Sequence, residues 1–259
     1  MVARDYSTIS PSARSLLLVK AQTELPFARK AAELLFGADA VARGEPGDRA
    51  AESRRIHFER RARSVDDALG AHGGARVLEI AAGLSFRGLA MAARQSVTYV
   101  DTDLPELVSI KAELAPRLHP GPLVGSLRLQ ALDALDSDAF RRTVEEMPKG
   151  DLAIVHEGLL MYLGEDEKTR LATSVREALL ERGGAWITAD VYVRSETHLL
   201  RDETTQRFLD THRVDENKFA DWAAADRFFT SNGFTIERRL APAGDTWPVR
   251  ETWTLRARP

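Results

Sequence analysis

Cysteine is absent from the 259-residue chain, and aromatic residues make up only 7% of it. The missing thiols exclude disulfides, thiolate metal sites and cysteine nucleophiles, and they are compatible with the reducing cytosol. Long apolar runs are missing too, because Leu16–Val19 is far too short to cross a bilayer and the N-terminus shows no apolar signal core. We therefore expect a cytoplasmic protein that makes no use of a membrane.

Charge and missing motifs remove further classes of function. The net charge is −3 and the pI is near 6.1, so no excess of positive charge indicates nucleic-acid binding. The six histidines are scattered, with no H-x-H or H-x-x-x-H pair, and we expect no metal site. No G-x-S-x-G elbow supports serine hydrolase chemistry. These observations leave the oligomeric state open.

One stretch organises the chain. Arg76–Gly88 has the pattern of an apolar strand, a turn of small residues and a helix start, and Val97–Pro105 that of a strand ending in two acids. Together they predict one βαβ unit. The sharp turn Ala81–Gly83 lets a ligand lie against bare backbone, and the helix N-terminus adds unpaired N–H groups. An acid at the tip of the next strand accepts hydrogen bonds from ribose hydroxyls, which predicts a nucleoside-containing cofactor.

The missing phosphate motifs narrow the choice of nucleoside. The dinucleotide fingerprint G-x-G-x-x-G is absent because Ala81 stands in place of its first glycine. Gly83 and Gly88 have roughly the spacing of a phosphate-binding loop, but Leu89 follows where that loop has lysine. An adenosine without phosphates, S-adenosyl-L-methionine, is therefore the favoured cofactor. The alternative is a buried βαβ turn that binds no ligand.

Residues 1–72 are predicted to form an N-terminal helical cap and not an independent domain. Helices are expected at Ser12–Lys20, Phe27–Phe36 and Arg49–Leu69, with a loop at Gly37–Gly47. The third helix is rich in arginine, but Glu52 and Glu59 interrupt the positive charge. A mostly solvated face is expected there, with one or two arginines turned inward toward a carboxylate.

Residues 73–259 are predicted to form the α/β body. Strands are expected near 75–81, 97–102, 127–131, 151–156, 185–191, 234–240 and 251–257, and helices near 104–118, 138–147, 165–182 and 219–231. The alternation indicates a parallel sheet with right-handed crossovers, whereas the last two strands follow each other closely and must be antiparallel neighbours. A polar helical insert is expected at about 192–222. This is the outline of a class I methyltransferase (Rossmann-like) fold, a mostly parallel seven-stranded sheet with an antiparallel terminal strand.

Several acids follow the predicted strands at the ligand edge. Asp101 and Asp103 compete for the ribose, because strand alternation does not choose between them and Asp103 also suits the N-cap of the next helix. Asp133 follows the third strand, where it would face the adenine or lie in an ordinary polar loop. Ala134 beside it is a further candidate for cofactor contact.

The segment His156–Leu163 follows the fourth strand, which is the usual place for functional groups in such a sheet. Glu157 would hold the methionine amine or the substrate. His156 would act as a general base or be a satisfied core histidine, and the core interpretation is favoured for a lone histidine. His156 and Tyr162 are the catalytic candidates of this segment.

Several segments resemble the leucine carboxyl methyltransferase family, which includes protein phosphatase methyltransferases and bacterial polyketide carboxyl O-methyltransferases. The resemblance covers about residues 12–190. It rests on Val77–Gly83, Tyr99–Glu106 with Lys111, Glu157–Leu163 and the arginine-containing Arg61–Leu69. The segment that begins at Glu157 is the most specific part.

The resemblance implies a role for each matching residue. Arg61 would meet the methionine carboxylate, Gly83 would line the cofactor, Asp103 would take the ribose, Asp133 would lie by the adenine and Glu157 by the amine. Glu79, Ala81 and Arg14 are further cofactor-binding candidates. The sequence departs from the family at Ala81, where a glycine is usual, and at Leu25-Pro26, where Asp-Pro is usual.

The resemblance and the residues together predict methyl transfer to an oxygen, on a carboxylate of a small molecule or of a chain terminus. A carboxylate is already ionised at pH 7 and needs no strong base. A phenol or hydroxyl O-methyltransferase with His156 as base is one alternative, and a non-catalytic cofactor-binding protein is another. The acceptor is expected to meet the insert, through Tyr192, Arg194, His198 and Arg201.

Overall fold

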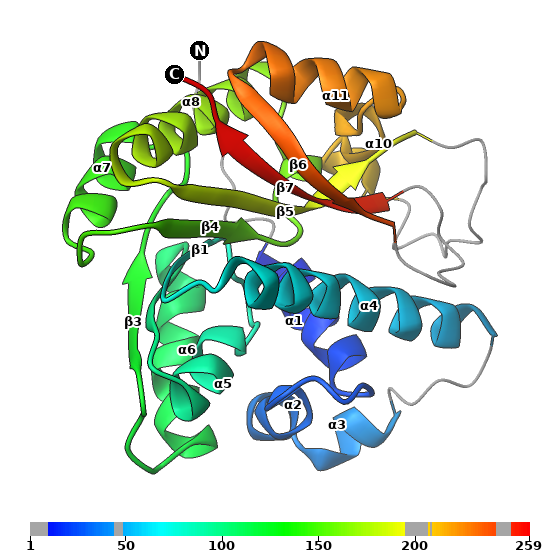
Figure 1. Cartoon of the computed structure of the whole chain (residues 1–259). Coiled ribbons are helices and arrows are strands. Elements are labelled where there is room, and N and C mark those ends of the chain that lie inside the picture. Colours follow the sequence, from blue (N-terminus) through cyan, green and yellow to red (C-terminus); the bar gives the residue numbers. More distant parts are fainter. Residues whose placement is uncertain (1–9, 44–48, 195–206, 208, 242–249) are drawn as a thin grey trace.

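A seven-stranded sheet with helices on both faces forms the centre of the computed structural model (Figure 1). The structure describes residues 10–43, 49–194, 207, 209–241 and 250–259. The strands are β1 (Arg76–Ile80), β2 (Thr98–Asp103), β3 (Ser126–Ala131), β4 (Leu152–His156), β5 (Gly184–Tyr192), β6 (Phe234–Leu240) and β7 (Arg250–Ala257). Their order is β3-β2-β1-β4-β5-β7-β6. β7 runs antiparallel to both of its neighbours, and the other pairs are parallel.

Helices precede, connect and follow the strands. They are α1 (Ser10–Lys20), α2 (Ala28–Phe36), α3 (Ala38–Arg43), α4 (Arg49–His72), α5 (Arg87–Arg94), α6 (Pro105–Leu118), α7 (Ser137–Glu145), the 3-10 turn η2 (Leu160–Tyr162), α8 (Glu165–Arg182), α10 (Val214–Asn217) and α11 (Trp222–Ser231). Within the described ranges, no helix is long and apolar enough to cross a membrane.

The central strands are apolar on both faces because helices cover both. Successive side chains of a strand point to opposite faces. Leu78 and Ile154 accordingly join the core beneath α7, α8 and α11, while Val77 and Ala153 join the core beneath α4 and α5. A near-continuous apolar run is what a parallel sheet buried on both faces requires.

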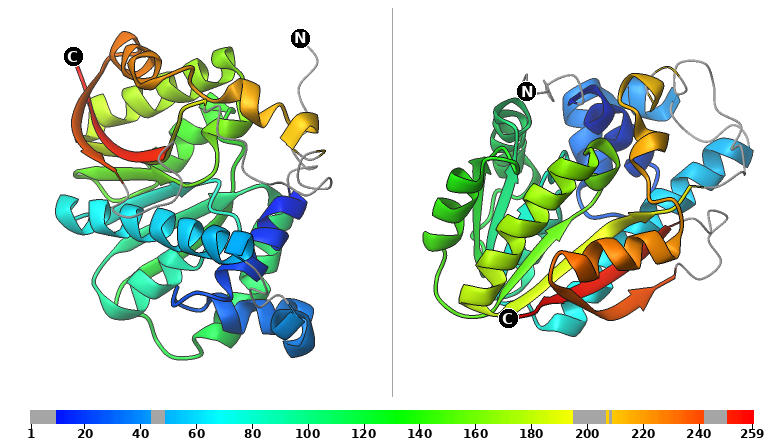
Figure 2. Two further views of the ribbon diagram at one scale, coloured as in Figure 1. Left: turned by 90° about the vertical axis from the view of Figure 1, so that its right-hand side faces the viewer. Right: turned by 90° about the horizontal axis from the view of Figure 1, so that it is seen from above.

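The helix α4 belongs to the layer that covers the sheet. Its apolar residues Val65, Ala68 and Leu69 recur at helical spacing and pack with Ile187 of β5. Figure 1 shows α4 lying across the sheet, with α1, α2 and α3 beyond it. Two further views show α1–α3 grouped at one side of the sheet (Figure 2). A cap that ends at residue 72 therefore does not coincide with a break in packing.

Most predicted elements lie where the sequence placed them, and the fold prediction is confirmed. The predicted loop Gly37–Gly47 is wrong in part, because α3 occupies residues 38–43. The predicted helix at 219–231 begins later, at Trp222, since Asp221 caps it by accepting a hydrogen bond from the Ala224 amide at 2.6 Å. Much of the polar insert predicted at 192–222 lies outside the described residues.

Candidate functional site

The site is organised around the turn that follows β1. Ala81 and Gly83 both have left-handed backbone angles, with φ of 50° and 56°. The Gly83 amide donates to Asp103 Oδ2 at 2.6 Å, and the Leu104 amide donates to Asp103 Oδ1 at 2.7 Å. Burial raises the pKa of Asp103, although the two amides oppose the rise. The hydrogen bond from Gly83 therefore links the last residue of β2 to the turn that follows β1.

Asp101 has a different environment from Asp103. It is buried, and Lys111 Nζ of α6 lies 2.6 and 2.5 Å from its two carboxylate oxygens. Burial raises its pKa to about 7, even though the Lys111 ammonium favours the ionised form. The structure thus brings Asp103, and not Asp101, to the Gly83 turn.

Glu157 lies just after β4 at the centre of a buried cluster of charges. Its Oε1 accepts hydrogen bonds from Lys20 Nζ at 2.7 Å and from Arg61 Nε at 3.1 Å. Its Oε2 accepts from Arg87 Nη2 at 3.0 Å. Burial opposes ionisation of Glu157, but these cations outweigh it and hold its pKa well below the usual range. Glu157 is therefore a carboxylate shared by three helices.

Arg87 links this cluster to a second pair of acids. It donates to Asp66 Oδ1 at 2.5 Å and also bonds Glu79, whose other oxygen accepts from Tyr99 Oη at 2.7 Å. Glu79 is fully buried and both of its oxygens are engaged. The Glu79 carboxylate thus bonds Arg87 of α5 and Tyr99 of β2, and its contact with a cofactor stays a prediction.

Tyr192 lies beside Arg61 at the end of β5. Its hydroxyl is 3.2 Å from Arg61 Nη1 and 3.1 Å from His57 Nε2, and the tyrosine is buried. Burial alone lowers the pKa of Arg61, but Tyr192 and Glu157 raise it above its usual value. Tyr192 was expected to meet the acceptor. Its hydroxyl contacts Arg61 and His57, and its role toward the acceptor stays a prediction.

The two catalytic candidates differ in exposure. His156 is completely buried, and its Nδ1 lies 2.9 Å from Asp190 Oδ2. This position fits the core interpretation of His156, and its role as a base stays a prediction. Tyr162 is partly buried and hydrogen bonds with Ser12 of α1. Burial raises the pKa of the Tyr162 phenol above its ordinary value.

Other cofactor candidates lie at the periphery of the turn. Asp133 is exposed, and its Oδ1 accepts from the Leu135 amide at 2.9 Å, while Ala134 is buried beside it. Arg14 pairs with Glu106 at 3.1 Å on the surface. The Arg14 contact is therefore an ion pair between α1 and α6.

The acceptor candidates are described only in part. Arg194 is exposed, and its Nη2 donates to the backbone carbonyl of Glu216 at 2.6 Å. His198 and Arg201 lie outside the described residues. No group of three or more His, Cys, Asp or Glu that could hold a metal ion occurs in the part of the chain that the structure describes.

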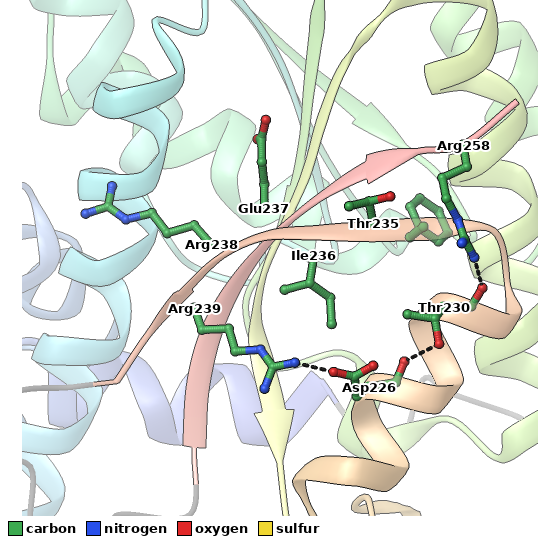
Figure 3. A pocket seen from close by; sticks show the side chains of 9 residues that line it. Asp226, Thr230, Thr235, Ile236, Glu237, Arg238, Arg239 and Arg258 are labelled. Atoms are coloured by element: carbon green, nitrogen blue, oxygen red, sulfur yellow. Dashed lines mark hydrogen bonds and ion pairs between the residues drawn. The ribbon is translucent and has the colours of Figure 1, made fainter.

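Two hollows accompany the site. A groove of about 430 Å³ runs between α4 and α5, and its lining includes Lys20, Asp66 and Arg87. A second hollow of about 490 Å³ lies between α11 and β6 (Figure 3). There Arg239 pairs with Asp226, and none of the charged cluster around Glu157 reaches it. This second hollow is therefore not assigned to the site.

The sequence analysis missed four buried polar residues that lie around Glu157 and Arg61. These are Lys20, His57, Arg87 and Asp190. Lys20 carries no local signal, because it meets Glu157 across 137 residues of chain. Arg87 had one available signal: it opens the helix directly after the small-residue turn.

The charge pattern around Glu157 fits the amino-acid end of S-adenosylmethionine. Lys20 and Arg61 are complementary to an α-carboxylate, and Glu157 is complementary to an α-ammonium. Gly83 presents backbone at the turn, and the Asp103 carboxylate lies beside it. A carboxylate at such a strand end can accept hydrogen bonds from ribose hydroxyls. The residues present therefore suit this cofactor, and their arrangement needs no phosphate reader.

Comparison with known proteins agrees with this chemistry. The model of the leucine carboxyl methyltransferase family matches residues 11–176. No curated protein matches the chain.

Among solved structures, a DUF574 family protein from Streptomyces avermitilis has a TM-score of 0.60 at 14% identity, covering 96% of this chain and 97% of that one. Magnesium protoporphyrin IX methyltransferase from Synechocystis, with bound S-adenosylhomocysteine, has a TM-score of 0.56 at 12% identity, covering 98% and 100%. The methyltransferase SibL has a TM-score of 0.52 at 18% identity, covering 98% and 77%. Identities this low show the shared fold. Since the family model spans more than half of the sequence, the chain belongs to the leucine carboxyl methyltransferase family of S-adenosylmethionine-dependent methyltransferases.

Proposed function

We propose that the protein transfers a methyl group to a carboxylate oxygen, forming a methyl ester on a small molecule or a chain terminus. The observation that carries this proposal is the position of His156. His156, the residue predicted as base for a hydroxyl acceptor, is completely buried and bonded to Asp190. A carboxylate acceptor is ionised at pH 7 and needs no such base. The carboxyl chemistry in the family's name points the same way.

In this proposal the residues of the protein bind the cofactor and align it with the acceptor. Arg61 and Lys20 hold the methionine carboxylate, Glu157 holds the amine, and Asp103 holds the ribose against the Gly83 backbone. S-adenosylmethionine supplies the activated methyl group when it is bound. Alignment of the acceptor oxygen and exclusion of water are the protein's contribution to the rate.

Recognition of the acceptor falls to the region that follows β5. Arg61 donates a hydrogen bond to the Tyr192 hydroxyl, and in this proposal both residues belong to the methionine end of the site. Arg194, His198 and Arg201 remain as the predicted partners of an anionic acceptor. Arg194 is exposed and donates a hydrogen bond to the backbone carbonyl of Glu216, a contact that does not neutralise its positive charge.

The experiment that tests the proposal identifies the bond formed. The protein is incubated with methyl-labelled S-adenosylmethionine and a panel of carboxylic acids that includes a peptide ending in a free leucine carboxylate. An ester releases labelled methanol in mild base, and an ether does not. We expect base-labile product, with Glu157→Gln giving the background. Labelled product that survives base would contradict the carboxylate assignment and favour a hydroxyl acceptor.

A further inference from the structure

The buried carboxylate of Asp190 accepts hydrogen bonds from the residues on either side of Glu157 in the sequence. Asp190 of β5 is buried, and its side chain accepts hydrogen bonds from four donors. The donors are His156 Nδ1 at 2.9 Å and the backbone amides of Gly158 at 2.6 Å, Leu159 at 2.5 Å and Leu160 at 3.2 Å. These donors lie on both sides of Glu157 in the sequence.

The segment after β4 obtains its position from these bonds. β4 ends at His156, so the three amides lie beyond the ladder that pairs β4 with β5. Gly158 has a φ of 87°, and a Cβ at this position would lie 3.4 Å from Arg61 Nη2. The chain therefore turns sharply beside Arg61, and Asp190 supplies the acceptor for the amides that the turn exposes.

Asp190 keeps the charge that these donors require. Burial favours its neutral form, but His156, Arg61 and the Leu159 amide outweigh burial and lower its pKa. An ionised carboxylate has enough lone pairs for all four donors, whereas a neutral amide in its place offers one oxygen.

We infer that Asp190 is a positioning residue, which fixes Glu157 for the cofactor's α-ammonium group by anchoring the turn to the rigid strand β5. The inference rests on the proposed role of Glu157. Asp190 itself touches no reacting group. Its contribution should therefore be specific to ligands that carry the amino-acid end of the cofactor.

The test compares two ligands that differ in that end. S-adenosylhomocysteine carries the amino acid, and 5′-methylthioadenosine lacks it. Calorimetry measures both dissociation constants for the wild type, Glu157→Gln, Asp190→Asn and the double variant. We expect Asp190→Asn to weaken S-adenosylhomocysteine at least fivefold and to change 5′-methylthioadenosine less than twofold. In the Glu157→Gln background, Asp190→Asn should raise the dissociation constant of S-adenosylhomocysteine less than twofold further. The reason is that Asp190 acts on this ligand only through Glu157.

A distant capping residue provides the matched control. Asp221→Ala removes the N-cap of α11 and should lower thermal stability without changing the ratio of the two affinities. If Glu157→Gln leaves the ratio unchanged, the proposed role of Glu157 fails. If Glu157→Gln changes the ratio and Asp190→Asn weakens both ligands equally, the positioning inference is overturned.

Hydrogen exchange on the wild type needs no variant and covers the case in which Asp190→Asn does not fold. The amides of Gly158, Leu159 and Leu160 should be protected like those of β4, and S-adenosylhomocysteine should protect them further. Exchange of these amides at the rate of an exposed loop would overturn the anchoring by Asp190.

Discussion

Asp101 and Asp103 are separated by one residue but have different hydrogen-bond partners, and we therefore expect different effects when each is substituted. Asp103 meets the Gly83 amide, whereas Asp101 is neutralised by Lys111 in the interior. We expect Asp103→Ala to lose a charged acceptor for the cofactor, which costs about 1.5–3 kcal/mol and weakens S-adenosylhomocysteine at least tenfold in calorimetry. The matched variant Asp101→Asn should lower the melting temperature while changing this affinity less. The reverse pattern would transfer the ribose role to Asp101.

The charge on Glu157 gives stability a defined pH dependence. Its folded pKa lies well below the unfolded value of 4.5, because the surrounding cations outweigh burial. The stabilisation is therefore complete above pH 4.5 and is lost as the pH falls through the folded pKa. Glu157→Gln leaves buried cations without their partner and should cost about 3–5 kcal/mol at neutral pH.

The measurement for Glu157 is thermal unfolding of the wild type and of Glu157→Gln between pH 3 and 7. The gap between the two melting temperatures should be widest at neutral pH and should narrow below pH 4.5. Arg141→Ala serves as a surface control, since Arg141 is exposed and pairs with the exposed Asp138 on α7. A difference in melting temperature that stays constant between pH 3 and 7 would contradict the conclusion that Glu157 is ionised in the folded protein.

The sequence predicted those parts of the site that lie within short motifs. The motif segments around Gly83 and Glu157 placed the turn and the acid correctly, and the expected inward arginine is Arg61, which pairs with Glu157. Lys20 and Asp190 were not predicted, because each acts on the segment after β4 from a distant part of the chain. Nothing in the residues beside Lys20 distinguishes it from a solvated lysine at a helix end.

Among the elements, the strands were the easiest to predict. The apolar run Leu152–His156 is buried on both faces, and such runs are typical of parallel strands between helical layers. The antiparallel pairing of β6 and β7 followed from the short connection between them. The position of β7 between β5 and β6 depends on long-range packing that no local pattern expresses.

Two helices show why the cap was harder to predict. α3 has six residues and buries only Val41, so its apolar signal is too weak to separate it from a loop between glycines. α4 contains many arginines and is polar over most of its length. The short apolar stripe at Val65, Ala68 and Leu69 is therefore hard to recognise in the sequence. That stripe decides the packing of the helix, although the charged residues dominate its composition.

At the scale of the whole molecule, the sheet order brings distant segments to one edge. β1, β2 and β4 are neighbours, so the Gly83 turn, Asp103 and Glu157 follow adjacent strand ends. α1 and α4 then add Lys20 and Arg61 to the same place. The resulting cluster is held by residues from both ends of the predicted cap and from the sheet, which explains why cap and body pack as one unit.

The same distribution of charge leads to a prediction about metal ions. The buried acids Asp101 and Glu157 are neutralised by Lys or Arg side chains, and across the described ranges no cluster of acids or histidines is arranged to hold a cation. An ionised carboxylate acceptor also needs no Lewis acid to become nucleophilic. We therefore expect dialysis against EDTA to leave turnover and melting temperature unchanged. Samples with re-added magnesium should match the dialysed enzyme, with Glu157→Gln as the inactive reference. Turnover that is lost on dialysis and restored by magnesium would contradict this prediction and indicate a metal-assisted acceptor such as a catechol.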